Sequence, residues 1–335
     1  MSQWQGKNVL ITGCTGFIGS RLANRLVQSG AQVVGIIRDH VAASNLFQSG
    51  VFNHMQAAYG DITDFHFVNR VLAEYEIDTV FHLAAQTIVT IANRSPLSTF
   101  ESNIKGTWTV LEACRLSPTV ERIVVASSDK AYGRSAELPY TEDQPLQGNH
   151  PYDVSKSCSD LIAQSYYQTY RLPVVISRLA NVYGGGDLNF NRLVPGTVQA
   201  VLADRAPTIR SDGSPLREYL YIEDAVAAYL LLAEHLHRPA VVGQAFNFAP
   251  HHPISVLEMV QTIIKISGKN LKPRILGQRT PAAEIEQQYS DSSRARKILQ
   301  WHPRWGLEAG LADTLAWYRQ YLEGVKDLGS IKNVR

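Results

Sequence analysis

Short apolar runs alternate with longer amphipathic segments through the first half of the chain. The short runs, rich in Val and Ile, predict buried strands at 7–12, 32–37, 54–59, 79–83, 122–127 and 174–178. The longer segments have apolar residues three and four positions apart, which predicts helices at 17–29, 97–115 and 152–170. Wholly apolar strands that alternate with helices are typical of a parallel sheet covered on both faces. We therefore expect an α/β fold with a doubly wound parallel sheet.

The pattern changes after residue 178. A stretch rich in Gly and Asn follows at 181–192, and later elements are shorter and interrupted by more prolines. A helix at 224–235, with Asp224 as its N-cap, is expected to return to the first domain. We therefore expect a first domain of residues 1–178 plus about 222–250. A smaller mixed α/β C-terminal domain would hold residues 179–221 and 251–330.

Composition excludes several classes of protein. A chain of 335 residues with 45% hydrophobic and 19% charged residues is long enough for two domains. A net charge of +2 gives no reason to expect a nucleic acid or a membrane surface as partner. The N-terminus does not resemble a signal peptide, and the longest apolar run, 225–233, is too short to span a bilayer. Three scattered cysteines argue against disulfides and a metal site, so we expect a cytoplasmic protein without a metal.

A glycine-rich loop follows the first strand. Gly13, Gly16 and Gly19 stand between that strand and the first helix, where glycine permits a tight turn and close approach to a pyrophosphate. The loop therefore predicts a dinucleotide coenzyme. An acidic residue after the second strand would bind the ribose hydroxyls of NAD, whereas a basic residue would accommodate the phosphate of NADP. Arg38 and Asp39 stand there together, so we expect NAD and keep NADP as the alternative.

Tyr152 and Lys156 lie one turn apart on one predicted helix. A nearby cation lowers the pKa of a tyrosine from its usual value of about 10, which lets the phenol exchange a proton with a substrate hydroxyl. A solvated helix face is the alternative for such a pair alone. The glycine-rich loop and the preceding strand, which ends at Ser127 and Ser128, favour the catalytic interpretation.

These features resemble the extended short-chain dehydrogenase/reductase family, also described as NAD-dependent epimerases and dehydratases. The resemblance rests on T-G-x-x-G-F-I-G at 12–19, G-D-I-T-D at 60–64, H-L-A-A-Q at 82–86 and Asn103. It implies a Rossmann-type first domain that binds NAD(P), a second domain that binds a sugar nucleotide, and a homodimer. The coenzyme-binding residues that it implies are Gly13, Thr15, Gly16, Phe17, Ile18, Gly19, Arg38, Asp39, Asp61, Ile62, Leu83, Ala84, Ala85, Asn103, Tyr152 and Lys156.

Ser128, Asp129 and Lys130 resemble the nucleotide-sugar 4,6-dehydratase branch of that family. The Asp-Lys pair is similar to that of CDP-glucose 4,6-dehydratases and of UDP-N-acetylglucosamine 4,6-dehydratases of another branch. The dTDP-glucose enzymes have Asp-Glu, and 4-epimerases usually have small or neutral residues. The resemblance implies that Ser128 hydrogen-bonds the reacting oxygen. A 4-epimerase, a surface ion pair in a loop, and a non-catalytic NAD(P)-binding protein remain alternatives.

The chemistry of dehydration explains the two ionisable groups. Oxidation at carbon 4 acidifies the proton on carbon 5, which a base removes, while an acid protonates the departing hydroxyl on carbon 6. We assign Asp129 as the acid and Lys130 as the base. A direct ion pair would favour the charged form of each, which neither role can use. Neighbouring residues that leave a strand tend to point in opposite directions, so direct pairing is not required.

The resemblance also implies a set of substrate-binding residues: Gln86, Asn181, Arg192, Arg217 and Tyr289. Guanidinium groups suit a diphosphate because their fork geometry permits two parallel hydrogen bonds. The Asp-Lys pair favours CDP-glucose, and GDP- and UDP-hexoses stay open. His82, after the fourth strand, is expected to be structural.

Overall fold

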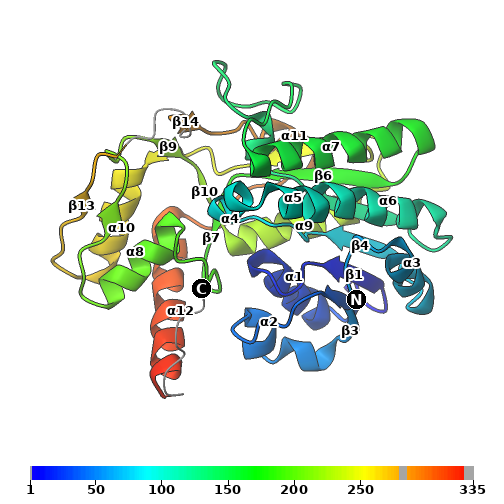
Figure 1. The fold of residues 1–335 in the computed structure, drawn as a ribbon, viewed down its shortest axis with the longest axis horizontal. Helices are drawn as coiled ribbons and strands as arrows, with labels where there is room; N and C mark the ends of the chain where they lie inside the picture. The colour runs from blue at the N-terminus through cyan, green and yellow to red at the C-terminus, as the bar shows by residue number, and fades with distance from the viewer. Residues whose placement is uncertain (1, 279–284, 328–335) are drawn as a thin grey trace.

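Seven parallel strands form the central sheet of the computed structural model, which describes residues 2–278 and 285–327 (Figure 1). Their order is β11-β6-β5-β4-β1-β2-β3. Because β1 lies between β4 and β2, the direction of winding reverses there, and a crevice opens at the carboxyl ends of the strands. The strands are β1 (Asn8–Thr12), β2 (Gln32–Ile37), β3 (Gln56–Tyr59), β4 (Thr79–His82), β5 (Arg122–Ala126), β6 (Val174–Leu179) and β11 (Ala245–Phe248). This confirms the expected Rossmann-type sheet.

Helices cover both faces of the sheet because side chains alternate along each strand. Val9 and Ile11 pack in a core with residues of α1 (Phe17–Gln28) and α9 (Ile222–His235). Leu10 lies in a second core, on the opposite face. That core also contains residues of α3 (Phe65–Glu74), α6 (Gly106–Leu116) and α7 (Pro151–Tyr170). The expected two-sided cover is confirmed.

Three of the predicted elements differ in the structure. The helix expected at 97–115 is α5 (Pro96–Phe100) and α6 joined by a π-helical turn, Glu101–Lys105. The strand expected from residue 54 begins at Gln56, because a 3₁₀ turn occupies Val51–His54. Asp224 is not an N-cap, and that prediction is wrong. Its carboxylate accepts hydrogen bonds from the backbone N–H groups of Arg304 (2.8 Å) and Trp305 (3.1 Å), while α9 begins at Ile222.

A second lobe lies beside the carboxyl ends of the sheet (Figure 1). Its helices are α8 (Leu193–Leu202), α10 (Val256–Ser267) and α12 (Leu307–Asp327). Its strands are β7 (Asn181–Tyr183), β8 (Thr208–Ile209), β9 (Leu216–Arg217), β10 (Tyr219–Tyr221), β12 (Ile254–Ser255), β13 (Arg274–Ile275) and β14 (Gln287–Gln288). The remaining short helices of the chain are α2 (Asn45–Gln48) and α4 (Val89–Arg94), which contact helices of the first lobe, and α11 (Ser293–Leu299), which contacts β11. The predicted domain boundaries remain a proposal, and residues 279–284 and 328–330 lie outside the described residues.

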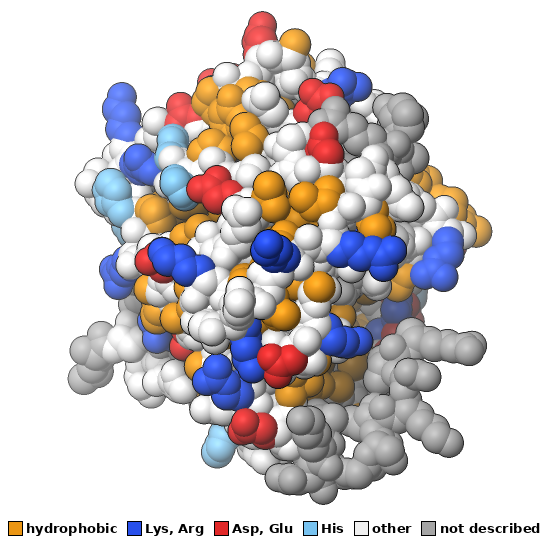
Figure 2. All heavy atoms as spheres, turned by 90° about the vertical axis from the view of Figure 1, so that its left-hand side faces the viewer, with side chains coloured by type: hydrophobic (Ala, Val, Ile, Leu, Met, Phe, Trp, Pro, Cys, Tyr) orange, Lys and Arg blue, Asp and Glu red, His pale blue; other side chains and the backbone are white. Residues whose placement is uncertain are grey.

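Figure 2 shows the outer face of this lobe, over α8, α10 and β13. Lys and Arg side chains are scattered there among apolar and neutral ones and do not gather into a single basic field. Within the described ranges, no helix is both long and apolar enough to cross a bilayer.

Candidate active site

A cleft of about 920 Å³ opens at the carboxyl ends of the strands and is lined from both lobes. Asn103 and Tyr289 are the two predicted site residues that do not line it. The predicted residues that it brings together are Gly13, Thr15, Gly16, Phe17, Ile18, Gly19, Arg38, Asp39, Asp61, Ile62, Leu83, Ala84, Ala85, Gln86, Ser128, Asp129, Lys130, Tyr152, Lys156, Asn181, Arg192 and Arg217.

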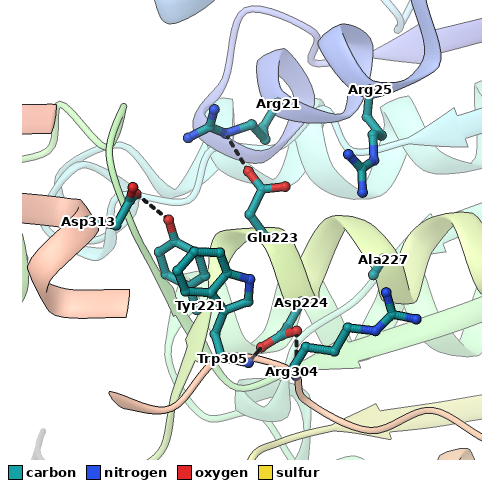
Figure 3. A pocket seen from close by; sticks show the side chains of 9 residues that line it. All are labelled: Arg21, Arg25, Tyr221, Glu223, Asp224, Ala227, Arg304, Trp305 and Asp313. Atoms are coloured by element: carbon teal, nitrogen blue, oxygen red, sulfur yellow. Dashed lines mark hydrogen bonds and ion pairs between the residues drawn. The ribbon is translucent and has the colours of Figure 1, made fainter. Parts of the chain in front are cut away.

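A smaller cavity of about 340 Å³ lies between α1, α9 and the start of α12 (Figure 3). Its acidic groups are already engaged: Glu223 pairs with Arg21 at 3.1 Å, and Asp313 accepts from the Tyr221 hydroxyl (Figure 3). None of the predicted site residues lines this cavity. The larger cleft is therefore the candidate active site.

The glycine-rich loop leaves room and hydrogen-bond donors for a dinucleotide. Gly13 has a φ of +76°, and a Cβ there would stand 2.8 Å from the backbone of Ala84. A Cβ at Gly19 would stand 2.2 Å from the carbonyl oxygen of Gly13, so neither position admits a side chain. The N-terminus of α1 has no side-chain cap and no acidic residue in its first turn, which leaves its N–H groups for an anion. These residues fit a coenzyme diphosphate.

A buried histidine helps to hold residues 83 and 84, which line the cleft next to the glycine-rich loop. The Thr12 hydroxyl accepts from the backbone N–H groups of Leu83 (3.2 Å) and Ala84 (3.1 Å). His82 Nδ1 lies 2.8 Å from that hydroxyl, and His82 Nε2 lies 3.0 Å from the hydroxyl of Thr107. Burial lowers the pKa of His82 to about 3, so the ring is neutral at physiological pH. The structural role expected for His82 agrees with these contacts.

Asn103 lies behind the cleft lining, where it holds Gln86 in place. Its Oδ1 accepts from the Gln86 N–H at 2.7 Å, and its Nδ2 donates to the Gln86 carbonyl at 3.1 Å and to the Ser155 hydroxyl at 2.8 Å. The π-helical turn carries Asn103, and such turns are frequent at functional sites. Asn103 therefore supports the lining and is not part of it.

Arg38 and Asp39 pair with each other at the rim, with 2.7 Å between Nε and Oδ2. Both side chains are more than half exposed, and such pairs contribute at most about 1 kcal/mol. Either side chain can turn toward a ribose, so the pair does not discriminate NAD from NADP. Asp61 also lines the cleft, and its carboxylate accepts from the Thr63 N–H at 2.8 Å.

Tyr152 and Lys156 lie in the first two turns of α7 and face the end of β5. Lys156 Nζ donates to the carbonyl oxygen of Ala126 at 2.7 Å, and burial lowers the pKa of this amine to about 8. Burial raises the pKa of Tyr152 to about 12, although the charge of Arg192 and the Ser128 hydroxyl act in the opposite direction. The expectation that Lys156 lowers this pKa is wrong for the protein alone, so the phenol keeps its proton at neutral pH.

Asp129 and Lys130 do not form an ion pair in the described part of the chain. They lie in a 3₁₀ turn, Asp129–Tyr132, and not in an extension of the strand. Burial raises the pKa of Asp129 above its ordinary value, against the opposing charges of Lys130 and Arg217. Ser128 Oγ donates to Asp129 Oδ1 at 3.1 Å, while Lys130 Nζ donates to Gln288 Oε1 at 3.0 Å. This arrangement favours a protonated Asp129 and leaves Lys130 with an uncharged partner.

The predicted substrate-binding residues form two groups. Arg192 donates to Asp187 at 3.0 Å and to the hydroxyl of Thr87 at 3.3 Å, which spans the two lobes. Asn181 Nδ2 donates to the carbonyl oxygen of Glu218 at 3.2 Å. Tyr289 is half-buried, and its carbonyl accepts from the N–H of Tyr140 at 2.9 Å. Arg192, Asn181, Arg217 and Gln86 thus face the cleft, whereas Tyr289 does not.

Sequence reasoning missed Gln288 and Asp187, which hold Lys130 and Arg192. Gln288 is 158 positions from Lys130, and no local pattern connects them. Asp187 stands in the glycine-rich stretch five positions before Arg192, so its acidic side chain beside a predicted substrate arginine was a usable signal.

The sheet, the glycine-rich cradle and the Ser-Tyr-Lys group at the ends of the strands are typical of the extended short-chain dehydrogenase/reductases. The family model for GDP-mannose 4,6 dehydratase matches residues 10–314. CDP-glucose 4,6-dehydratase of Salmonella typhimurium is 31% identical over 335 residues, covering 96% of this chain and 93% of that protein. The chain therefore belongs to the GDP-mannose 4,6 dehydratase family.

Solved structures with this fold include dehydratases and epimerases. The dTDP-glucose 4,6-dehydratase of Bacillus anthracis, in complex with NAD, matches with a TM-score of 0.83 and 26% identity, covering 96% of this chain and 100% of that one. The UDP-glucose 4-epimerase of Thermotoga maritima, with UDP-glucose, matches with a TM-score of 0.85 and 26% identity, covering 94% and 99%. Fold alone does not separate the two reactions.

Proposed function

We propose that this protein is a nucleotide-sugar 4,6-dehydratase that converts an NDP-hexose to the NDP-4-keto-6-deoxyhexose with bound NAD. The observation that carries the proposal is the placement of Asp129 and Lys130 in the cleft beside Ser128 and Tyr152, without an ion pair between the first two. A 4-epimerase needs neither an added acid nor an added base. Dehydration needs both.

Each of these residues has a defined proton to hold or move. Tyr152 takes the proton of the hydroxyl on carbon 4, and Ser128 hydrogen-bonds that oxygen. Lys130 takes the proton from carbon 5 and later delivers a solvent-exchangeable proton to the same carbon, while Asp129 gives its proton to the hydroxyl that leaves carbon 6 as water. Bound NAD would supply a hydride acceptor for carbon 4 and a hydride donor for carbon 6, and its positive charge in the cleft would favour the phenolate of Tyr152. The net reaction is the loss of one water without an external reductant.

The Asp-Lys pair and the 31% identity to a CDP-glucose enzyme support CDP-glucose as the substrate. Arg192 and Arg217 line the cleft and carry the guanidinium groups that a diphosphate requires. The 26% identity to a dehydratase solved with NAD supports NAD as the coenzyme.

A panel of substrates tests this proposal. The purified protein is incubated, without added reductant, with CDP-, UDP-, GDP- and dTDP-glucose, and each mixture is followed by mass spectrometry. We expect one of them to lose one water, and Asp129→Asn to abolish the loss. A substrate that changes to an isomer of equal mass would identify a 4-epimerase, which the structural similarity to the Thermotoga maritima enzyme favours as the second candidate.

We also propose a homodimer. Large apolar side chains are exposed on α5, α6 and α7, which lie side by side (Figure 1). Apolar side chains gathered on neighbouring helices are typical of a protein–protein interface. Those exposed are Leu97, Trp108, Leu116, Leu161 and Tyr170.

A further inference from the structure

The amine of Lys130 has a single hydrogen-bond acceptor among the described residues, and it comes from the other lobe. Gln288 Oε1 lies 3.0 Å from Lys130 Nζ. The Gln288 side chain has no exposed surface, whereas Lys130 is half-buried and lines the cleft. Gln288 Nε2, by contrast, has no hydrogen-bond partner in the described part of the chain.

The backbone of Gln288 is fixed on both sides. It lies in β14, where it pairs with Arg217 of β9. Arg217 donates to the carbonyl oxygens of Ile285 and of Glu286, the latter at 3.3 Å. On the other side, the carboxylate of Glu218 accepts from the N–H of Ser290 at 2.8 Å. The side-chain amide of Gln288 is therefore carried by a paired strand and not by a loose loop.

The charged groups around Lys130 explain why the acceptor is an amide. The charge of Lys130 lowers the pKa of Asp129, on the same turn, and of Asp153, on α7, against the larger effect of burial. From the second lobe, the charge of Arg217 lowers the pKa of Asp129, and burial, with a smaller contribution from the charge of Asp129, raises the pKa of Glu218. A direct bond from Lys130 to either aspartate would favour the ammonium form, which cannot accept a proton. An amide carries no charge and imposes no such preference.

An amide also suits both forms of the amine. Its oxygen accepts from the ammonium, and its NH₂ group can donate to the lone pair of the neutral amine if the side chain turns. A carboxylate offers acceptors only. Because Nε2 of Gln288 has no hydrogen-bond partner among the described residues, such a turn would break no hydrogen bond of the NH₂ group.

We propose that Gln288 is a positioning residue that holds the amine of Lys130 on a neutral acceptor, apart from the two aspartates, so that the amine can remove the proton from carbon 5. The inference rests on the proposed function. The contact between Gln288 and Lys130 makes the proposed base depend on a side chain from the second lobe. The two lobes must therefore be docked for the dehydration step.

The test compares Gln288→Glu and Gln288→Met with Gln287→Glu, a matched control that adds the same charge on the exposed side of β14. The substrate is whichever glucose of the four-nucleotide panel the wild type dehydrates, and kcat and KM are measured from pH 6 to 9.5. For Gln288→Glu we expect an unchanged KM and a rising limb of the kcat profile displaced to higher pH. One unit of displacement gives a loss of about tenfold at neutral pH. Gln287→Glu should match the wild type.

Gln288→Met keeps the side-chain volume and removes the hydrogen-bond acceptor for Lys130. It therefore tests the inference even if Gln288→Glu does not fold. We expect its kcat to fall about tenfold across the pH range, which is part of the roughly 10²–10⁴-fold that a positioned proton acceptor contributes, with KM and bound coenzyme unchanged. Wild-type profiles in both Gln288 variants would overturn this inference and leave the dehydratase intact. A wild type that releases no water from any of the four sugars would instead overturn the proposed function, and this inference with it.

Discussion

Arg178 and Asp160 form a buried, two-point ion pair directly behind the turn that carries Asp129 and Lys130. Arg178 Nε lies 2.8 Å from Asp160 Oδ2, and Nη2 lies 2.9 Å from Oδ1. The side chains are 2% and 0% exposed. Arg178 Nη1 also donates to the hydroxyl of Tyr132, the last residue of the turn, at 2.8 Å. Through these hydrogen bonds, the ion pair links the turn Asp129–Tyr132 to both β6 and α7.

Loss of that arginine should destabilise the protein strongly. Arg178→Met leaves the buried carboxylate of Asp160 without its countercharge and with only the amide of Gln164, at 2.7 Å, as a hydrogen-bond donor. Removing one partner of a buried ion pair typically costs about 3–5 kcal/mol of the free energy of unfolding. Urea unfolding measures it. The double variant Arg178→Met, Asp160→Leu removes both charges and should recover part of the loss. Equal stability of the wild type and the single variant would show that the pair does not support the fold.

His82 should make stability fall in mild acid. Its pKa is about 3 in the folded protein, because burial disfavours the charged ring, against about 6.5 unfolded. The unfolded chain therefore binds the proton first. The stability that the neutral ring contributes is complete above pH 6.5 and is lost, by about 1.4 kcal/mol per pH unit, as the pH falls toward 3. Urea unfolding at pH 7 and pH 5 should show a larger drop in the wild type than in His82→Asn. The same drop in both would contradict this.

Asn103→Ala should weaken coenzyme binding without touching the coenzyme. Gln86 directly follows the predicted coenzyme-binding residues 83–85, and the variant leaves its half-buried N–H and carbonyl groups without their partners. Each lost hydrogen bond costs about 0.5–1.5 kcal/mol. Titration with NAD, followed by protein fluorescence, measures the affinity. Glu101→Ala, an exposed change on the same π-helical turn, is the control and should bind like the wild type. Unchanged affinity in Asn103→Ala would show that this support is dispensable.

A charged side chain in place of an exposed apolar one on α6 should dissociate the proposed dimer. Trp108 is 45% exposed there, and Ile275, on β13 of the second lobe, is 46% exposed and serves as a matched control. In light scattering at micromolar concentration, we expect a dimer for the wild type and Ile275→Asp, and a monomer for Trp108→Asp. A monomeric wild type contradicts the proposal outright.

Local features could be predicted from the sequence, and long-range ones could not. The glycine-rich turn and the spacing of Tyr152 and Lys156 depend on a few consecutive residues, so their positions in the cleft follow from sequence pattern. The pKa of Tyr152 depends on how deeply the fold buries the phenol, so the sequence pattern alone predicts a lowered pKa where burial raises it. Asp224 has an N-cap residue type, but the backbone of Arg304, 80 positions away, takes its carboxylate. Gln288 meets Lys130 only after both lobes have folded.

The most direct test of the dehydratase is the fate of the proton on carbon 5. The wild type is incubated in D₂O with the sugar nucleotide that it turns over, and the product is examined by mass spectrometry and proton NMR. We expect a product that has lost one water and carries one deuterium on carbon 5, and no such product from Lys130→Met. An isomer of unchanged mass without deuterium would contradict the account, because carbon 5 would then never have been deprotonated.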